Sequence, residues 1–251
     1  MATKKNQETR KKQQKHAKKV AKSSPARHIK PKPKPKPKQK QKDTVMLDIP
    51  LYPQTEEFTS AAASAMMVIK YLNPTYKLRK EEEFVIWQEA VNGSVWHGSK
   101  YGLAYALGKR IGGVGIISNT KDEGYERKLA VYENINLDTL TASFNEIRQK
   151  SQTLNISEEQ SEITTSTIKK ALSNNQIPIV LIDVKAINSI PEPSPHWVVV
   201  KGYDKDAFYI NDPYSNSTIS IDTEVFKAAL GFDNDKHMVY VDSRAAKRKK
   251  S

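Results

Sequence analysis

Cysteine is absent from all 251 residues of the sequence. This absence excludes disulfide bonds, thiolate metal sites and a cysteine nucleophile. Long apolar runs are missing too, because no segment approaches the ~18 apolar residues of a membrane-spanning helix. The basic N-terminus has no apolar segment behind it and is not typical of a secretory signal. With neither disulfides nor a signal, the expected compartment is the cytoplasm.

Positive charge is concentrated at the two ends of the chain. Residues 1–42 hold 17 Lys or Arg and one Glu, and residues 244–251 hold five Lys or Arg and no acid. The remainder has 19 basic and 27 acidic residues. We therefore expect a disordered Lys/Pro-rich tail over 1–43, one globular domain over 44–243 and a basic C-terminal tail over 244–251.

The N-terminal tail has the composition of a polyanion-binding segment. Residues 30–38 strictly alternate Lys and Pro, which predicts an extended spacer of polyproline-II type. The charge of residues 1–42 predicts nonspecific binding to nucleic acid or another polyanion by counterion release. A solubilising tail without a specific partner is the alternative. Aromatic residues are not interleaved with the lysines, so sequence-specific recognition is not expected.

The order of the predicted elements indicates the fold class. Apolar spacing of 3.6 residues and capping residues predict helices at 60–72, 80–91, 101–110, 137–149, 165–172 and 223–230. Short apolar runs predict strands at 45–52, 114–117, 129–133, 177–184, 197–202, 207–210, 217–221 and 237–241. Helices come first and strands follow, which is the α+β pattern rather than βαβ alternation. We expect N-terminal helices packed on a C-terminal antiparallel sheet.

The loop before the first helix ends in two residues that can cap it. The hydroxyl of Thr59 or Ser60 can accept the backbone N–H groups of the first turn. The side chain of Ser60 then lies at a helix N-terminus, where the macrodipole favours negative charge. Cysteine peptidases place their nucleophile in such a position. Here the residue is serine.

A histidine and two other polar residues complete a candidate catalytic set. His196 begins one predicted strand, Asp212 follows the end of the next, and a turn at 202–206 predicts a hairpin that brings them together. His196 would act as general base and acid, and Asp212 would orient its ring. The amide of Gln54 could donate into an oxyanion hole. By spacing alone, a capping or core histidine, an Asp-Pro turn and a polar loop glutamine remain alternatives.

Trp96 and His97 are further candidates, as residues of a substrate pocket, and a loop histidine without a role is the alternative for His97. The histidines are scattered, so we expect no metal site and no cofactor. The acidic run at 81–83 is expected to be a solvated helix start.

Several motifs, in order, resemble those of papain-fold cysteine peptidases of the bacteriocin-leader-processing (double-glycine leader peptidase) type. The clearest match is to the family pattern Gln-Thr-x-x-Phe-Thr-Cys-Gly-Pro-Ala. The matching segments here are Gln54-Thr55-Glu56-Glu57-Phe58-Thr59-Ser60, Glu83-x-x-x-Trp87, Gly98-x-x-Tyr101-Gly102-Leu103-Ala104, residues 177–182, Pro195-His196-Trp197 and Asp212-Pro213. The resemblance spans about residues 44–242 and implies a papain-like fold and hydrolysis of a peptide or isopeptide bond.

The resemblance also implies roles for single residues, with one departure. Gln54 corresponds to the oxyanion-hole donor, His196 to the base and Asp212 to the orienting acid. At the nucleophile the family has Cys-Gly-Pro, and this chain has Ser60-Ala61-Ala62. Because a serine hydroxyl is far less acidic than a thiol, the site is expected to be inactive as written.

Three explanations of the serine remain open. They are a natural pseudo-peptidase, a Cys-to-Ser change in the chain, and a working serine hydrolase. The alternative function is a non-catalytic module that binds a peptide or protein and is tethered by its basic tails to nucleic acid or a ribonucleoprotein.

Overall fold

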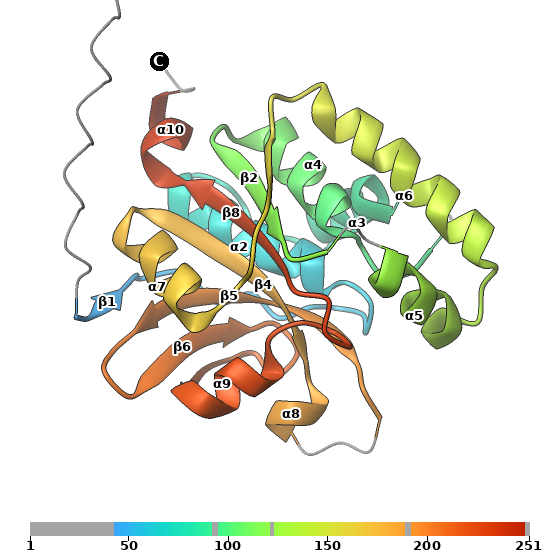
Figure 1. The fold of residues 1–251 in the computed structure, drawn as a ribbon. Coiled ribbons are helices and arrows are strands. Elements are labelled where there is room, and N and C mark those ends of the chain that lie inside the picture. The colour runs from blue at the N-terminus through green and yellow to red at the C-terminus, as the bar shows by residue number, and fades with distance from the viewer. Residues whose placement is uncertain (1–42, 92–94, 121–122, 189–191, 249–251) are drawn as a thin grey trace, which may run out of the picture. The chain divides into compact units, whose positions relative to one another are not determined.

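The computed structural model describes residues 43–91, 95–120, 123–188 and 192–248 (Figure 1). Contacts divide the chain into two units, residues 1–39 and 40–251, and every described residue belongs to the second. The predictions for residues 1–42, including the polyproline-II spacer, lie outside the described residues.

A mixed sheet forms the centre of this unit (Figure 1). Its strands are β1 Val45–Met46, β2 Val114–Ser118, β3 Ser157–Gln160, β4 Gln176–Asp183, β5 Pro195–Tyr203, β6 Ala207–Asp212, β7 Ser217–Asp222 and β8 His237–Asp242. The order is β3-β2-β8-β4-β5-β6-β7, and β1 pairs with β5. All pairings among the described residues are antiparallel except that of β2 with β3. The α+β class is confirmed, and the sheet departs from the expected antiparallel one at β3.

Helices cover both faces of the sheet. They are α2 Ser60–Leu72, α3 Lys80–Val91, α4 Lys100–Arg110, α5 Glu123–Glu133, α6 Leu137–Gln152, α7 Thr165–Ser173, α8 Lys185–Asn188, α9 Thr223–Ala229 and α10 Ser243–Arg248. Helices α2 and α4 contact β5 and β2, whereas α7 and α9 contact β4 and β6. Alternate residues of β4 enter two separate cores, with Ile179 and Leu181 in one and Val180 and Ile182 in the other. This burial of both faces explains why β4 is a continuous apolar run.

The sequence predicted some elements better than others. Helices 60–72 and 80–91 agree with α2 and α3, whereas the strand predicted at 129–133 is wrong, because these residues belong to α5. Tyr125 and Leu129, both buried, lie four residues apart, so the helical period is visible only in a longer window. Strand β3 was missed because its side chains are all exposed and give no alternation. Helix α10 crosses the boundary predicted at 243/244, and its Ala246 is buried.

Glu83 is buried, although residues 81–83 were predicted to be a solvated acidic run. Its side chain is fully buried and accepts hydrogen bonds from the hydroxyl of Tyr52 (3.0 Å) and the backbone N–H of Thr55 (2.9 Å). Burial and the Glu83 charge both raise the pKa of the Tyr52 hydroxyl, which therefore stays protonated and donates. Glu83 thus fastens helix α3 to the loop that carries Gln54.

Replacing Glu83 with Ala is expected to cost about 1–3 kcal/mol of unfolding free energy, because the buried hydroxyl of Tyr52 and the partly buried N–H of Thr55 lose their acceptor. Urea denaturation of both proteins measures the difference. The matched control is Glu81→Ala, which removes an exposed carboxylate from the same turn and is expected to change little. Equal effects of the two changes would contradict a structural role for Glu83.

Candidate active site

Ser60 is the first residue of α2, and its side chain is buried. Thr59 occupies the N-cap position but does not cap the helix. Its hydroxyl donates to the carbonyl oxygen of Glu56 (2.8 Å) and accepts from the N–H of Glu56 (3.2 Å). The predicted Thr59 cap is therefore wrong, because this hydroxyl closes the preceding loop. The positive end of α2 consequently lies at Ser60 without a side-chain cap from Thr59.

His196 and Asp212 lie together on one face of a hairpin. In the pairing of β5 with β6, Val199 faces Asn211, so Asp212 comes opposite Val198. His196 lies two residues before Val198 on β5, so its side chain is on the same face of the hairpin as that of Asp212. The His196 Nε2 atom lies 2.7 Å from Asp212 Oδ1, and both side chains are buried.

The carboxylate of Asp212 is held from two sides. Besides His196, the backbone N–H groups of Tyr214 (2.9 Å) and Ser215 (3.3 Å) donate to its oxygens. Burial by itself acts to raise the pKa of Asp212, but the hydrogen bond and charge of His196 and the bonds to residues 214 and 215 outweigh it, and the pKa lies below its ordinary value. The aspartate is thus ionised and able to fix the imidazole ring.

This lowered pKa predicts a pH dependence of stability. Because the folded pKa of Asp212 lies below the ordinary 3.8, its stabilising contribution is complete above about pH 4 and is lost as the pH falls through the folded value. Asp212→Asn is therefore expected to lower the melting temperature at any pH above about 4, and the difference between the two proteins should narrow below about pH 4. Thermal unfolding of both proteins across this range checks it. A difference that widens on acidification would contradict the assignment.

Backbone and side-chain bonds join the helix start to this hairpin. The N–H of Trp197 donates to Ser60 Oγ at 3.3 Å, and Ser64 Oγ donates to the carbonyl of Trp197 at 3.0 Å. The N–H of Gln54 donates to the carbonyl of Pro213 at 2.9 Å. Ser60 therefore lies beside the residue that follows His196, and the Gln54 loop lies beside the turn that follows Asp212.

The side chain of Gln54 is turned toward its own loop. Its Nε2 donates to the carbonyl oxygens of Glu56 (2.9 Å) and Glu57 (3.1 Å), and its Oε1 is buried with no hydrogen-bond partner among the residues that the structure describes. Donation to an oxyanion requires the amide to leave one of these carbonyls. The sequence could not reveal this, because the competing acceptors are backbone atoms of the same turn.

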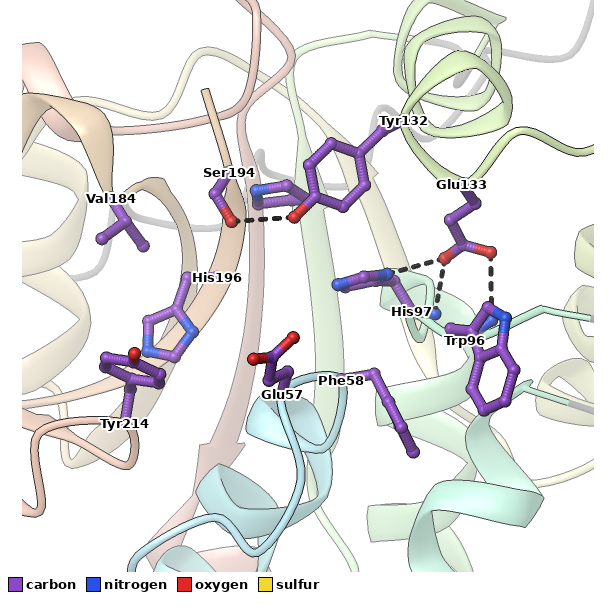
Figure 2. A pocket seen from close by; sticks show the side chains of 11 residues that line it. Glu57, Phe58, Trp96, His97, Tyr132, Glu133, Val184, Ser194, His196 and Tyr214 are labelled. Carbon is purple, nitrogen blue, oxygen red and sulfur yellow. Dashed lines mark hydrogen bonds and ion pairs between the residues drawn. The ribbon is translucent and has the colours of Figure 1, made fainter. Parts of the chain in front are cut away.

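A cavity of about 480 Å³ opens beside His196. Figure 2 shows its lining side chains, which are Glu57, Phe58, Trp96, His97, Tyr132, Glu133, Val184, Ser194, Pro195, His196 and Tyr214. This volume lies within the range of about 300–1,000 Å³ typical of ligand pockets. The predicted pocket residues Trp96 and His97 line it, whereas Ser60, Asp212 and Gln54 do not.

Glu133 organises the wall of the cavity opposite His196 and was missed in the sequence analysis. Its carboxylate accepts from the N–H groups of Trp96 (3.0 Å) and His97 (2.7 Å) and lies 2.7 Å from His97 Nδ1. The dashed lines of Figure 2 mark these bonds. Because Glu133 ends α5, the mistaken strand at 129–133 concealed it. The helical period of Tyr125 and Leu129 was the signal that could have found it.

Aromatic rings form the adjoining wall. The ring of Phe58 lies 4.9 Å from that of Trp87 and 4.8 Å from that of Trp96, measured between centroids. The Trp87 Nε1 donates to the carbonyl of Trp96 (2.8 Å), and the Trp96 side chain is 53% exposed. This wall offers an apolar surface to a ligand in the cavity.

In the described ranges, no group of three or more His, Asp or Glu side chains is placed to hold a metal ion. No helix among those same residues is both long and apolar enough to cross a membrane.

Comparison with known proteins gives one family and a general structural likeness. A family model described as "Peptidase_C39 like family" matches residues 49–245. A crystal structure described as that of a C39-like peptidase from Bacillus anthracis is 14% identical, with a TM-score of 0.47, covering 80% of this chain and 98% of that one. A second crystal structure is described as that of a double-glycine-motif protease from an AMS/PCAT transporter in complex with the leader peptide. It is 16% identical, with a TM-score of 0.41, and the match covers 78% of this chain and 94% of that one. No similar sequence was found among curated proteins.

Proposed function

The chain belongs to the Peptidase_C39-like family, and on this premise we propose that residues 44–243 form a peptidase-like domain for a peptide or isopeptide bond, inactive as written because Ser60 occupies the nucleophile position. The observation that carries the proposal is the 2.7 Å bond between His196 and Asp212, next to the start of α2.

Each residue has a distinct proposed role. The side chain at position 60 attacks the scissile carbonyl, and His196 takes its proton and then delivers it to the leaving amine. Asp212 holds the ring by Nε2, which leaves Nδ1 for the nucleophile. Gln54, once its amide has turned, and a backbone N–H near Ser60 stabilise the oxyanion.

Serine disables this chemistry through its acidity. A thiol beside an imidazole ionises near neutral pH, and the thiolate attacks without further proton removal. A serine hydroxyl must lose its proton during attack, so a site built for an ion pair does not activate it. The domain therefore keeps the binding cavity and the histidine–aspartate pair without the reactive atom.

The experiment is to restore the thiol. The Ser60→Cys protein and the chain as given are incubated with an internally quenched peptide library, and cleavage is followed by fluorescence. Cleavage is expected with Ser60→Cys, and it should disappear when His196→Ala is added. Cleavage by the unchanged chain at the same rate would contradict the assigned role of Ser60.

A second candidate is favoured by the serine itself. A domain that binds a peptide without cutting it needs the cavity but no nucleophile. A chain with Ser60 at the nucleophile position keeps the cavity and lacks the reactive thiol. The +16 charge of residues 1–42 would then tether the module to nucleic acid or a ribonucleoprotein. Salt-dependent RNA binding by the full chain, lost on removal of residues 1–42, together with inert Ser60→Cys, would favour this function.

A further inference from the structure

The cavity beside His196 is lined by two acidic side chains, of which Glu133 is paired with the ring of His97 and Glu57 has no such partner among the described residues. Glu57 and Glu133 both line it, and no Lys or Arg does so among the residues that the structure describes. The other titratable side chains facing it are His97, His196, Tyr132 and Tyr214. A cavity walled by one sign of charge concentrates ligand groups of the opposite sign.

Glu57 is the carboxylate with freedom to contact a ligand. It is exposed, lies three residues before Ser60 and points into the cavity (Figure 2). Within the described part of the chain its carboxylate forms no hydrogen bond or ion pair. Its neighbour Glu56 differs, because that carboxylate pairs with Lys80 at 3.2 Å and does not line the cavity.

Glu133 contributes charge from the opposite wall without being free to move. Its side chain is only 2% exposed and is fixed by the backbone of Trp96 and His97. One exposed carboxylate, Glu57, and one buried carboxylate, Glu133, thus line the cavity beside His196.

The rest of the lining suits a long side chain with a charged end. Phe58 and Trp96 offer an apolar wall along which the methylene stem of Lys or Arg can lie. Tyr214, 66% exposed, presents an aromatic ring that a cation can approach. A neutral apolar side chain would use the wall but leave the Glu57 carboxylate uncompensated.

We propose that this cavity is a specificity pocket for a substrate peptide with a Lys or Arg side chain next to the scissile bond, and that Glu57 is the residue that contacts the cation. The inference rests on the proposed function, since it names the substrate class of that same site. Glu57 acts in binding and takes no part in proton transfer.

The test uses the full chain as it exists, with Ser60 in place, so that binding is measured without turnover. Fluorescein-labelled hexapeptides that differ only in one Lys, norleucine or Glu are titrated and followed by fluorescence anisotropy. The Lys peptide is expected to bind about fivefold more tightly than the norleucine peptide, which corresponds to about 1 kcal/mol for a partly exposed ion pair. The Glu peptide is expected to bind most weakly.

Two variants show whether Glu57 is responsible. Glu57→Gln should remove most of the preference for Lys, and Glu56→Gln, the same charge change one residue away, should leave it intact. Because the exposed Glu57 carboxylate forms no hydrogen bond or ion pair with the described residues, the Gln variant is expected to fold normally. The inference would be overturned if the Lys and norleucine peptides gave equal anisotropy changes, whether large or at background. It would also be overturned if the preference for the Lys peptide survived Glu57→Gln.

A second measurement separates this inference from the proposed function. In the Ser60→Cys protein, labelling rates with a cationic and an anionic methanethiosulfonate are compared. The ratio of cationic to anionic rates, relative to a free thiol, should exceed one and fall in Glu57→Gln but not in Glu56→Gln. A rate ratio that is the same in Glu57→Gln overturns the acidic pocket. A ratio that falls in Glu57→Gln, together with labelling rates that do not change in His196→Ala, overturns the catalytic assignment instead.

Discussion

Replacing Ser60 with Cys is expected to give a thiol that is largely ionised at about pH 6 and reacts with iodoacetamide there at least about tenfold faster than an ordinary cysteine. Free cysteine has a pKa of about 8.5, so less than about 1% is thiolate at pH 6. At position 60 the N-terminal end of α2 favours the anion, and in the proposed site the imidazole of His196, the residue before Trp197, favours it as well.

The controls divide this effect between its causes. His196→Ala should remove most of the rate gain and return the pH profile toward that of a simple thiol, while the helix end keeps a small share. Ser220→Cys, at an exposed position of β7, supplies the ordinary thiol within the same protein. Since the chain has no other cysteine, each variant carries a single reactive group. Indistinguishable profiles for positions 60 and 220 would contradict a preformed pair.

Replacing Gly102 with Ala is expected to be strongly destabilising, although it adds a single methyl group. A Cβ atom at this position would lie 1.9 Å from the carbonyl oxygen of Ala90 and 2.7 Å from its carbonyl carbon. These are backbone atoms of α3, so no side-chain rotation relieves the clash and α3 and α4 must separate. Overpacking of this kind costs about 3 kcal/mol, or roughly 6–12 °C in melting temperature for a domain of this size.

Gly98→Ala is the matched control for this prediction. The nearest atoms to its added methyl group are the Cβ atoms of Ala90 and Ala61, at 3.5 and 3.6 Å, which is ordinary contact. Its melting temperature is expected to stay within about 3 °C of the unchanged chain. Thermal unfolding of both variants followed by circular dichroism measures the difference. Equal losses at the two glycines would show that α3 and α4 are not so closely packed.

The sequence predicted best where a local rule decides the structure. The bounds of α2 follow from Ser60 and from Asn73 before Pro74, since the residue before a proline disfavours helix. The hairpin of β5 and β6 follows from a short turn, but the contact of His196 with Asp212 also needs the register shift between Val200 and Gly202, which puts the two side chains on one face and which no sequence pattern indicated. Their catalytic roles stay predictions, because they depend on the family resemblance and on the nucleophile that the chain lacks.

Other features depend on contacts that no local pattern contains. The burial of Glu83 is decided by Tyr52 and Thr55, which lie 31 and 28 residues away along the chain. Glu133 likewise fixes backbone N–H groups 36 and 37 residues earlier, and from sequence it was only the last residue of a predicted strand. The acidic cavity therefore emerges only when α5 is placed against the loop before α4.

We propose that position 60, His196 and Asp212 form a nucleophile–His–Asp site whose reactive atom is missing because residue 60 is serine. The most direct measurement is the ultraviolet absorbance of the thiolate in Ser60→Cys as a function of pH, with the unchanged chain subtracted. It needs no substrate, and the single thiol makes the assignment unambiguous. We predict a thiol pKa below about 6 that rises by at least about one unit in His196→Ala. A pKa near about 8.5 in both proteins would contradict the account.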